Sequence, residues 1–193
     1  LSGNVTNNPL PVELDQFVAT TIKNEVILDW ATGHELNNTG FEVQRSGLNP
    51  SQSIHDTPVN ATFETIGFVT SKGNSNTGQS YKFNDKNLQT GRYAYRLKQI
   101  DVNGNHTFFL LNNEVSINLP GKFVISQNYP NPFNPVTNIN YEMPFDGSLK
   151  IVVFDNLGRE VQTLVNGNVS AGYYKAQFNG AGLPSGIYFY KVN

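Results

Sequence analysis

The sequence contains no cysteine and only one methionine and one tryptophan among its 193 residues. Without cysteine, the chain can form neither disulfide bonds nor thiolate metal sites. Charged residues make up only 15% and the formal net charge is -2, so the chain has no basic field that would hold nucleic acid or an anionic membrane. No apolar run approaches the roughly 18 residues that span a bilayer, so membrane insertion is not expected.

A recognisable N-terminal targeting segment is lacking as well. The chain begins at Leu1 with neither an initiator methionine nor a signal peptide. We therefore expect either that a leader has been removed or that the chain is a piece of a longer protein.

Turn-forming and aromatic residues, in contrast, are abundant, with 17 Gly, 10 Pro, 13 Phe and 9 Tyr. Apolar and polar residues alternate with a period of two, as where Val26, Leu28 and Trp30 are interleaved with Ile27 and Asp29. Turn signals rich in asparagine and glycine separate these short runs. The pattern predicts an all-β fold in which large aromatic side chains fill thin cores.

The alternation breaks at Leu119-Pro120-Gly121, which we interpret as a domain boundary. We predict an N-terminal extension over 1–10 and two tandem Ig/fibronectin III-like β-sandwiches over 11–119 and 120–193, because short strands at this spacing are typical of such sandwiches. In the first sandwich the alternating runs at 26–30, 41–45 and 93–98 are joined by expected strands at 12–19, 63–69, 80–83 and 107–117. In the second, strands are expected at 137–142, 149–154, 160–165, 173–178 and 187–192.

Three aromatic residues are predicted to lie in the core of the first sandwich. Trp30 ends an early strand, where such folds bury a large aromatic residue, and Tyr93 and Tyr95 alternate with polar neighbours. Leu88 followed by Gly91-Arg92-Tyr93 resembles a tyrosine corner, in which the tyrosine hydroxyl bonds back to upstream backbone. A carbohydrate-stacking platform is the alternative role for these rings, and the alternation favours core packing over it.

The segment Asn128–Pro135 contains three prolines at near-alternating positions, which predict an extended, polyproline-like path. We expect Tyr129 and Phe133 to anchor this path on the second sandwich. Because proline lowers the entropy lost on docking and the two rings have apolar area to bury, the segment is predicted to be ordered and packed.

Catalytic and metal-binding patterns do not emerge from the sequence. The three histidines, His34, His55 and His106, are far apart, and no catalytic site or cofactor site is expected. Asp101–Asn105 faintly resembles a calcium loop but lacks the glycine position and the distant glutamate of an EF-hand, so a hairpin turn is favoured. Asp155 and Glu160 flank a turn, where Arg159 is expected to pair with Asp155.

Four motifs of the second half occur together in an order and spacing that one family shares. They are Asn128–Pro135 (NYPNPFNP), Asp155–Val161 (DNLGREV), Gly172–Tyr174 (GYY) and Leu183–Tyr190 (LPSGIYFY). The set resembles the type A C-terminal sorting domain of type IX (Por) secretion cargo, which is related to the Ig-like domain of flagellar hook-cap proteins. The first half is similar to a fibronectin III-like module that often precedes it, in segments 10–14, 26–30, 35–46 and 95–101.

The resemblance implies a non-catalytic module of a larger bacterial cargo protein. It implies export across the outer membrane, followed by release or attachment at the cell surface, with the secretion and surface-attachment machinery as partners. Two alternatives remain open: a self-assembling subunit of an extracellular filament, whose partners are copies of the chain, and a carbohydrate-binding module.

The C-terminal segment motivates the filament alternative. Members of the family continue past the segment that corresponds to 187–192 into a final strand, whereas this sequence ends at Asn193. We therefore expect an unpaired strand edge beside Ile187, Tyr188, Phe189 and Tyr190, to which a neighbour could add its residues 1–10 as a strand.

Overall fold

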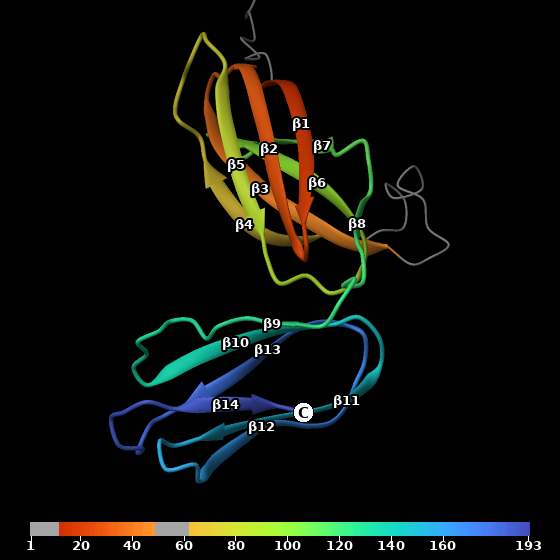
Figure 1. The fold of residues 1–193 in the computed structure, drawn as a ribbon. Coiled ribbons are helices and arrows are strands. Elements are labelled where there is room, and N and C mark those ends of the chain that lie inside the picture. The colour runs from red at the N-terminus through yellow and green to blue at the C-terminus, as the bar shows by residue number, and fades with distance from the viewer. Residues whose placement is uncertain (1–11, 49–61) are drawn as a thin grey trace, which may run out of the picture. The chain divides into compact units, whose positions relative to one another are not determined.

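The computed structural model describes residues 12–48 and 62–193, and these form strands and turns without helices. No helix among them could cross a bilayer. The chain divides into two compact units, Leu1–Ile117 and Asn118–Asn193, which are described separately below (Figure 1). The predicted all-β class and β-sandwich architecture are confirmed, because the strands form antiparallel sheets in both units.

The described residues of the first unit, 12–48 and 62–117, form eight strands in two sheets. One sheet has the order β1-β2-β5, and the other has the order β4-β3-β6-β7, with β8 also paired to β6. Their bounds are β1 Glu13–Ile22, β2 Glu25–His34, β3 Asn38–Leu48, β4 Glu64–Thr70, β5 Gln79–Asp85, β6 Gly91–Asp101, β7 His106–Leu110 and β8 Val115–Ile117. The strand predicted over 107–117 is therefore two strands, because the turn at Leu111–Glu114 lets the chain pair with β6 twice.

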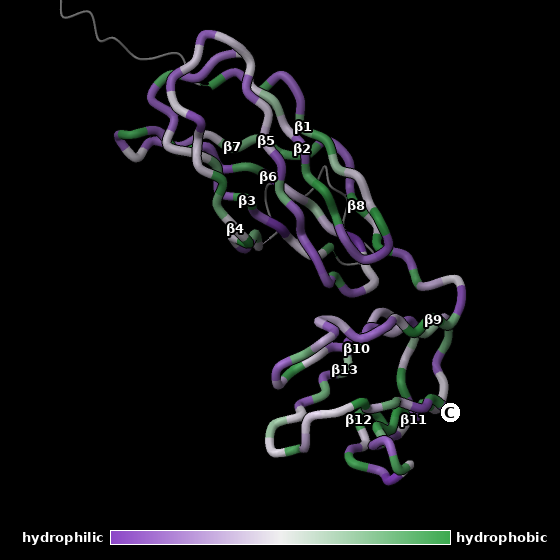
Figure 2. Tube along the Cα trace, turned by 60° about the vertical axis from the view of Figure 1, so that its left-hand side comes forward, coloured by the Kyte–Doolittle hydropathy of each residue, from purple (hydrophilic) through white to green (hydrophobic). Residues whose placement is uncertain are grey.

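The core of the first unit follows the period-two alternation of its strands, which Figure 2 shows as alternating hydrophobic and hydrophilic positions. Trp30 on β2 is 2% exposed and stacks on Tyr81, with ring centroids 5.6 Å apart. Its ring also meets Phe41 edge to face at 5.5 Å. Tyr95 is fully buried, as predicted. These contacts join the two sheets across one aromatic cluster.

Tyr93 differs from the prediction because it is only partly buried. Its ring lies beside the Arg45 guanidinium, 5.7 Å from the ring centroid, and its hydroxyl donates to the Gln89 carbonyl at 2.8 Å. The predicted tyrosine-corner hydrogen bond is thus present. The ring remains near the surface because its hydroxyl must reach a loop carbonyl.

Two buried carboxylates of the first unit accept hydrogen bonds that connect its loops and sheets. Asp85 on β5 accepts hydrogen bonds from Arg45 on β3 and Tyr95 on β6, which links the two sheets. Glu35, which is 1% exposed, accepts four hydrogen bonds. Its donors are Thr32, Asn38, Ser71 and Tyr81.

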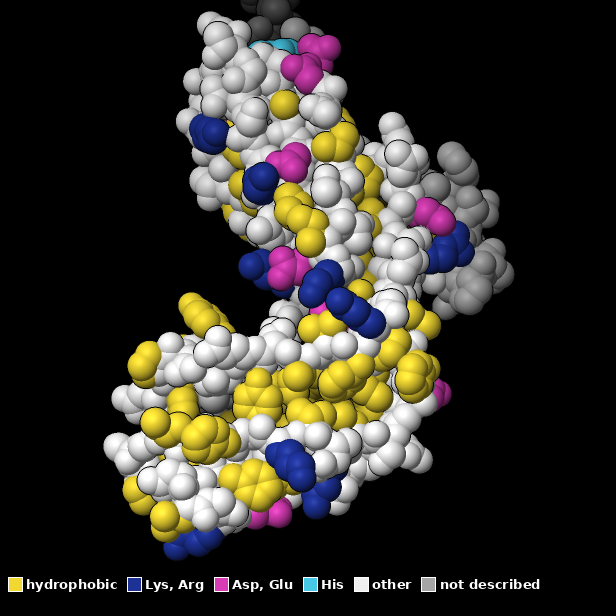
Figure 3. All heavy atoms as spheres, viewed as in Figure 1, with side chains coloured by type: hydrophobic (Ala, Val, Ile, Leu, Met, Phe, Trp, Pro, Cys, Tyr) yellow, Lys and Arg dark blue, Asp and Glu magenta, His cyan; other side chains and the backbone are white. Residues whose placement is uncertain are grey.

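The second unit contains two three-stranded sheets, ordered β13-β10-β9 and β12-β11-β14. The bounds are β9 Val124–Ile125, β10 Val136–Met143, β11 Gly147–Phe154, β12 Glu160–Val169, β13 Gly172–Asn179 and β14 Phe189–Val192. Its buried apolar residues alternate along β10, β11 and β13: Ile139, Tyr141, Met143, Leu149, Ile151, Val153, Ala176 and Phe178. Figure 3 shows hydrophobic side chains gathered on the visible face of this unit.

Candidate functional site

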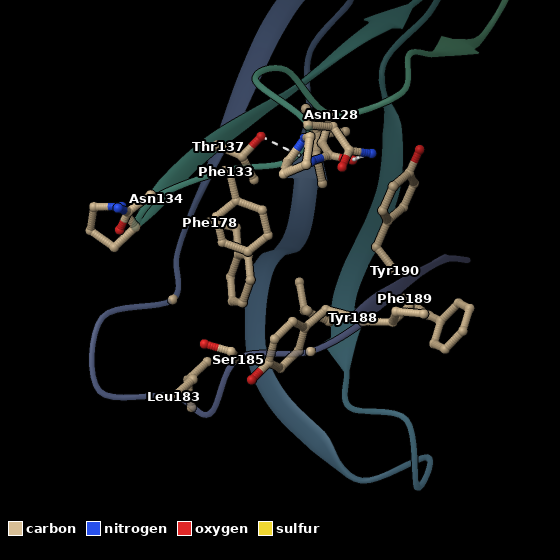
Figure 4. A pocket seen from close by; sticks show the side chains of 18 of the residues that line it. Asn128, Phe133, Asn134, Thr137, Phe178, Leu183, Ser185, Tyr188, Phe189 and Tyr190 are labelled. Atoms are coloured by element: carbon tan, nitrogen blue, oxygen red, sulfur yellow. Dashed lines mark hydrogen bonds between the residues drawn. The ribbon is translucent and has the colours of Figure 1, made fainter.

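Two loops of the second unit enclose a groove of about 470 Å³ (Figure 4). One wall is the proline-rich segment 128–135 and the other is the segment 183–190. Residues of three strands contribute to the lining between them: Thr137 and Ile139 from β10, Val153 from β11 and Phe178 from β13. The groove therefore brings together the first and the last of the four sequence motifs.

The proline-rich wall is held to β10 mainly through its backbone. Tyr129 and Asn138 exchange two backbone hydrogen bonds, of 2.9 and 3.0 Å. Thr137 Oγ1 donates to the Pro130 carbonyl at 2.7 Å and accepts from the Asn128 amide at 3.0 Å. The chain bends at 130–132 and again at 134–135. The expected extended path is therefore wrong.

The two aromatic residues of this wall behave differently from one another. The Phe133 ring packs against Phe178 at 5.5 Å, as the predicted anchor should. Tyr129, in contrast, is 82% exposed, so the prediction that its ring anchors the segment is wrong. The anchoring at this position comes from the paired backbone of Tyr129, which leaves its side chain directed outward.

Gly180 lies where the proline-rich wall meets the end of β13. A Cβ at Gly180 would lie 3.1 Å from Cε2 of Phe133, closer than ordinary packing allows. The Gly180 amide donates to the Pro135 carbonyl at 2.8 Å. A bare backbone at this position lets the proline-rich wall close against β13.

The second wall is held by tyrosine hydroxyls. Tyr188 donates to the Pro184 carbonyl at 2.6 Å, and its ring lies 5.6 Å from that of Phe178. Tyr190 donates to the Ser126 carbonyl at 3.2 Å. Figure 4 shows Phe133, Phe178 and Tyr188 close together and Phe189 turned away from them. The groove thus has a row of three rings with fixed positions.

The Tyr188 bond belongs to a tyrosine corner that occurs three times among the residues that the structure describes. In each copy an aliphatic residue, two further residues, glycine, one residue and tyrosine follow in order, and the hydroxyl bonds to the carbonyl four residues upstream. The copies are Leu88–Tyr93, Val169–Tyr174 and Leu183–Tyr188. Sequence reasoning noticed only the first copy, although the same spacing was visible in the other two. The GYY and LPSGIYFY motifs therefore have a structural explanation.

Both units also contain the same kind of aspartate turn. Asp101 and Asp155 each begin a five-residue turn in which one carboxylate oxygen accepts two backbone amides, at 2.8 to 3.0 Å. The other oxygen accepts from the side chain four residues on, Asn105 or Arg159. The predicted pairing of Arg159 with Asp155 is confirmed. The backbone amide of Arg159 is the main influence that lowers the pKa of Asp155.

No described residues form a cluster of three or more potential metal ligands. His34 lies on β2 and His106 on β7, while His55 lies outside the described residues. Burial raises the pKa of Glu35, but its four hydrogen bonds outweigh burial and the pKa is lowered overall. Because both oxygens of Glu35 already have two donors each, this carboxylate acts as a structural acceptor.

The predicted strand edge at residues 187–190 lines the groove. β14 pairs with β11 at one edge of its sheet, and Tyr188 precedes it. Ile187 and Phe189 are 69% and 58% exposed, whereas Tyr188 and Tyr190 are half-buried. The described part of the structure thus places β14 on an edge, while the proposed donor, residues 1–10, lies outside the described residues.

The second unit is thus a small all-β module with a two-walled groove. Residues 127–193 match the family model of the secretion system C-terminal sorting domain. The second unit therefore carries a sorting domain of type IX secretion cargo, as the resemblance predicted. Such a domain implies interaction with the type IX secretion machinery and export to a secreted or cell-surface location. No curated protein matches the chain.

Proposed function

We propose that the second unit is a non-catalytic module that directs a larger cargo protein through the type IX system and then attaches it to the cell surface. The observation that supports this most directly is the family match over 127–193, which contains both walls of the groove. The walls carry the first and the last of the four sequence motifs. We propose that they form the surface that the machinery recognises.

The test is export of a reporter in a bacterium that has a type IX system. The reporter, preceded by an export signal, is fused to the whole chain or to a chain that lacks residues 127–193. We expect the whole chain to place the reporter at the surface and the deletion to leave it in the periplasm. Equal surface labelling of the two, or labelling that survives loss of the machinery, would contradict the proposal.

We infer that the first unit is a fibronectin III-like spacer without catalytic activity. Its paired sheets and the Tyr93 corner support a fibronectin III-like sandwich. The full occupancy of the Glu35 oxygens supports a structural rather than catalytic role for its most buried carboxylate. The relation to flagellar hook-cap domains stays a prediction.

A filament subunit is the second candidate function. The position of β14 at a sheet edge favours it, because an exposed edge presents unpaired main-chain groups that a strand of another molecule could bind. Such head-to-tail addition would give fibres rather than closed dimers. Sedimentation at high concentration tests it, and a chain that stays monomeric, or a chain without residues 1–10 that still forms fibres, would rule out donation by that segment.

A further inference from the structure

We propose that the groove between segments 128–135 and 183–190 binds an uncharged saccharide. The volume of about 470 Å³ is within the range of small-ligand sites. This inference goes beyond the proposed sorting function and does not depend on it. The two walls of this site consist of the first and the last sorting motif.

The first observation is electrostatic. None of the residues that line the groove is charged, although charged residues make up 15% of the chain. A phosphate, sulfate or carboxylate would find no cation to compensate its charge on entering, and a burial of that kind is costly. The lining therefore selects against ionic ligands and favours a neutral one.

The second observation is the kind of polar group at the rim. Asn131, Asn134 and Ser185 are exposed and line the groove. An asparagine amide both donates and accepts, and so does a serine hydroxyl. Sugar hydroxyls have the same dual character, so each rim group can meet a hydroxyl in either orientation.

The third observation is the ring row. Phe133 and Tyr188 are partly exposed and flank the buried Phe178, with ring centroids 5.5 and 5.6 Å from it. Aromatic faces are electron-rich, and they pack well against the weakly positive C–H faces of a sugar ring. Polar groups at the rim and rings beneath them match the two sides of a pyranose.

The fourth observation separates a saccharide from an extended peptide. A bound strand must pair its own amides and carbonyls with backbone partners. In the walls, however, the carbonyls of Pro130, Pro135 and Pro184 already accept internal hydrogen bonds. The same bonds make the walls rigid before any ligand arrives, which lowers the entropy cost of binding. These three carbonyls are therefore not available to a bound strand, whereas the side chains of Asn131, Asn134 and Ser185 at the rim are exposed.

The experiment is an NMR titration of the full chain, labelled with ¹⁵N, with cellohexaose, laminarihexaose and mannohexaose. Hexagalacturonic acid serves as the charged counterpart and an uncharged hexapeptide as the strand-like competitor. We expect saturable shifts of the Asn131 and Asn134 side-chain amides with at least one neutral hexasaccharide. The charged oligomer and the peptide should bind at least tenfold more weakly.

The matched variants are Asn131→Ala/Asn134→Ala in the groove and Asn166→Ala/Asn168→Ala on β12. All four residues are exposed, so both proteins should fold, which an unchanged spectrum away from the sites will verify. The groove variant should lose at least tenfold in affinity and the β12 variant should bind as the parent does. The proposal is overturned if no neutral hexasaccharide binds, if the groove variant keeps full affinity, or if the peptide or the charged oligomer binds more tightly. Because the readout is binding by purified protein, it is independent of the export test.

Discussion

In the first unit, the rings of Trp30, Phe41 and Tyr81 lie between the two sheets and fill the core. In the second unit, Phe133 and Tyr188 flank the buried Phe178 from two loops and line a groove. Both units use the same turn devices, namely tyrosine corners and aspartate turns. The comparison shows that the same local chemistry can complete a closed core or hold two loops apart, depending on what the loops cover.

The largest expected effect is the loss of a buried ring from either core. Trp30→Ala and Phe178→Ala should each lower the free energy of unfolding by about 3–5 kcal/mol, because each removes a buried aromatic side chain. Urea denaturation followed by circular dichroism measures both. Trp30→Phe is the milder control, since it keeps a ring and removes an indole N–H that has no acceptor. An alanine variant that unfolds at the parental urea concentration would show that its ring does not belong to a core.

A buried carboxylate distinguishes the first unit from the second. Glu35→Gln should cost about 2 kcal/mol, because an amide nitrogen would then face hydrogen-bond donors. The lowered pKa of Glu35 also makes stability depend on pH. Its contribution is complete above the ordinary glutamate pKa of about 4.3 and is lost as the pH falls through the lower folded value. Unfolding at pH 7, 5 and 3 should show a decline that is smaller in Glu35→Gln, and identical declines would contradict the assignment.

Because both units contain tyrosine corners, the same substitution can be tested in each of them. Replacing Tyr93, Tyr174 or Tyr188 with phenylalanine removes one hydroxyl-to-carbonyl bond and keeps the ring. Each substitution should lower stability by about 1 kcal/mol, measured from thermal or urea unfolding. Tyr129→Phe is the control, since no corner forms there. If all three variants are as stable as the parent, the shared spacing has no energetic role.

The smallest change in stability is expected for Tyr129, in contrast to Phe133 in the same groove wall. Tyr129→Ala should change stability by less than about 0.5 kcal/mol, because its side chain is exposed. Phe133→Ala should have a larger effect and should open segment 128–135 to protease, because it removes the ring that packs on Phe178. Mass spectrometry of limited digests locates the cuts. Rapid cleavage in the parent protein would show that the segment is not packed.

Much of the fold could be predicted because strands carry a local signal. The alternation of Val26, Leu28 and Trp30 gave the buried face of β2, and these residues are almost fully buried. The Gly91-Arg92-Tyr93 pattern predicted a corner because the acceptor is only four residues away. The strand boundaries were less accurate, as at 107–117, because pairing with β6 decides where β7 ends and β8 begins.

Residues whose partners are close in the sequence were thus predictable, including the pairing of Asp155 with Arg159 and the four motifs that the sorting-domain match contains. The tertiary structure alone decided how those motifs meet. Nothing local to Tyr129 shows that its backbone pairs with Asn138 and leaves the ring exposed. Nor does any local pattern show that Phe133 and Tyr188 both contact Phe178. Such contacts depend on how the strands pair in space, and a groove between two distant loops exists only after the sheets have packed.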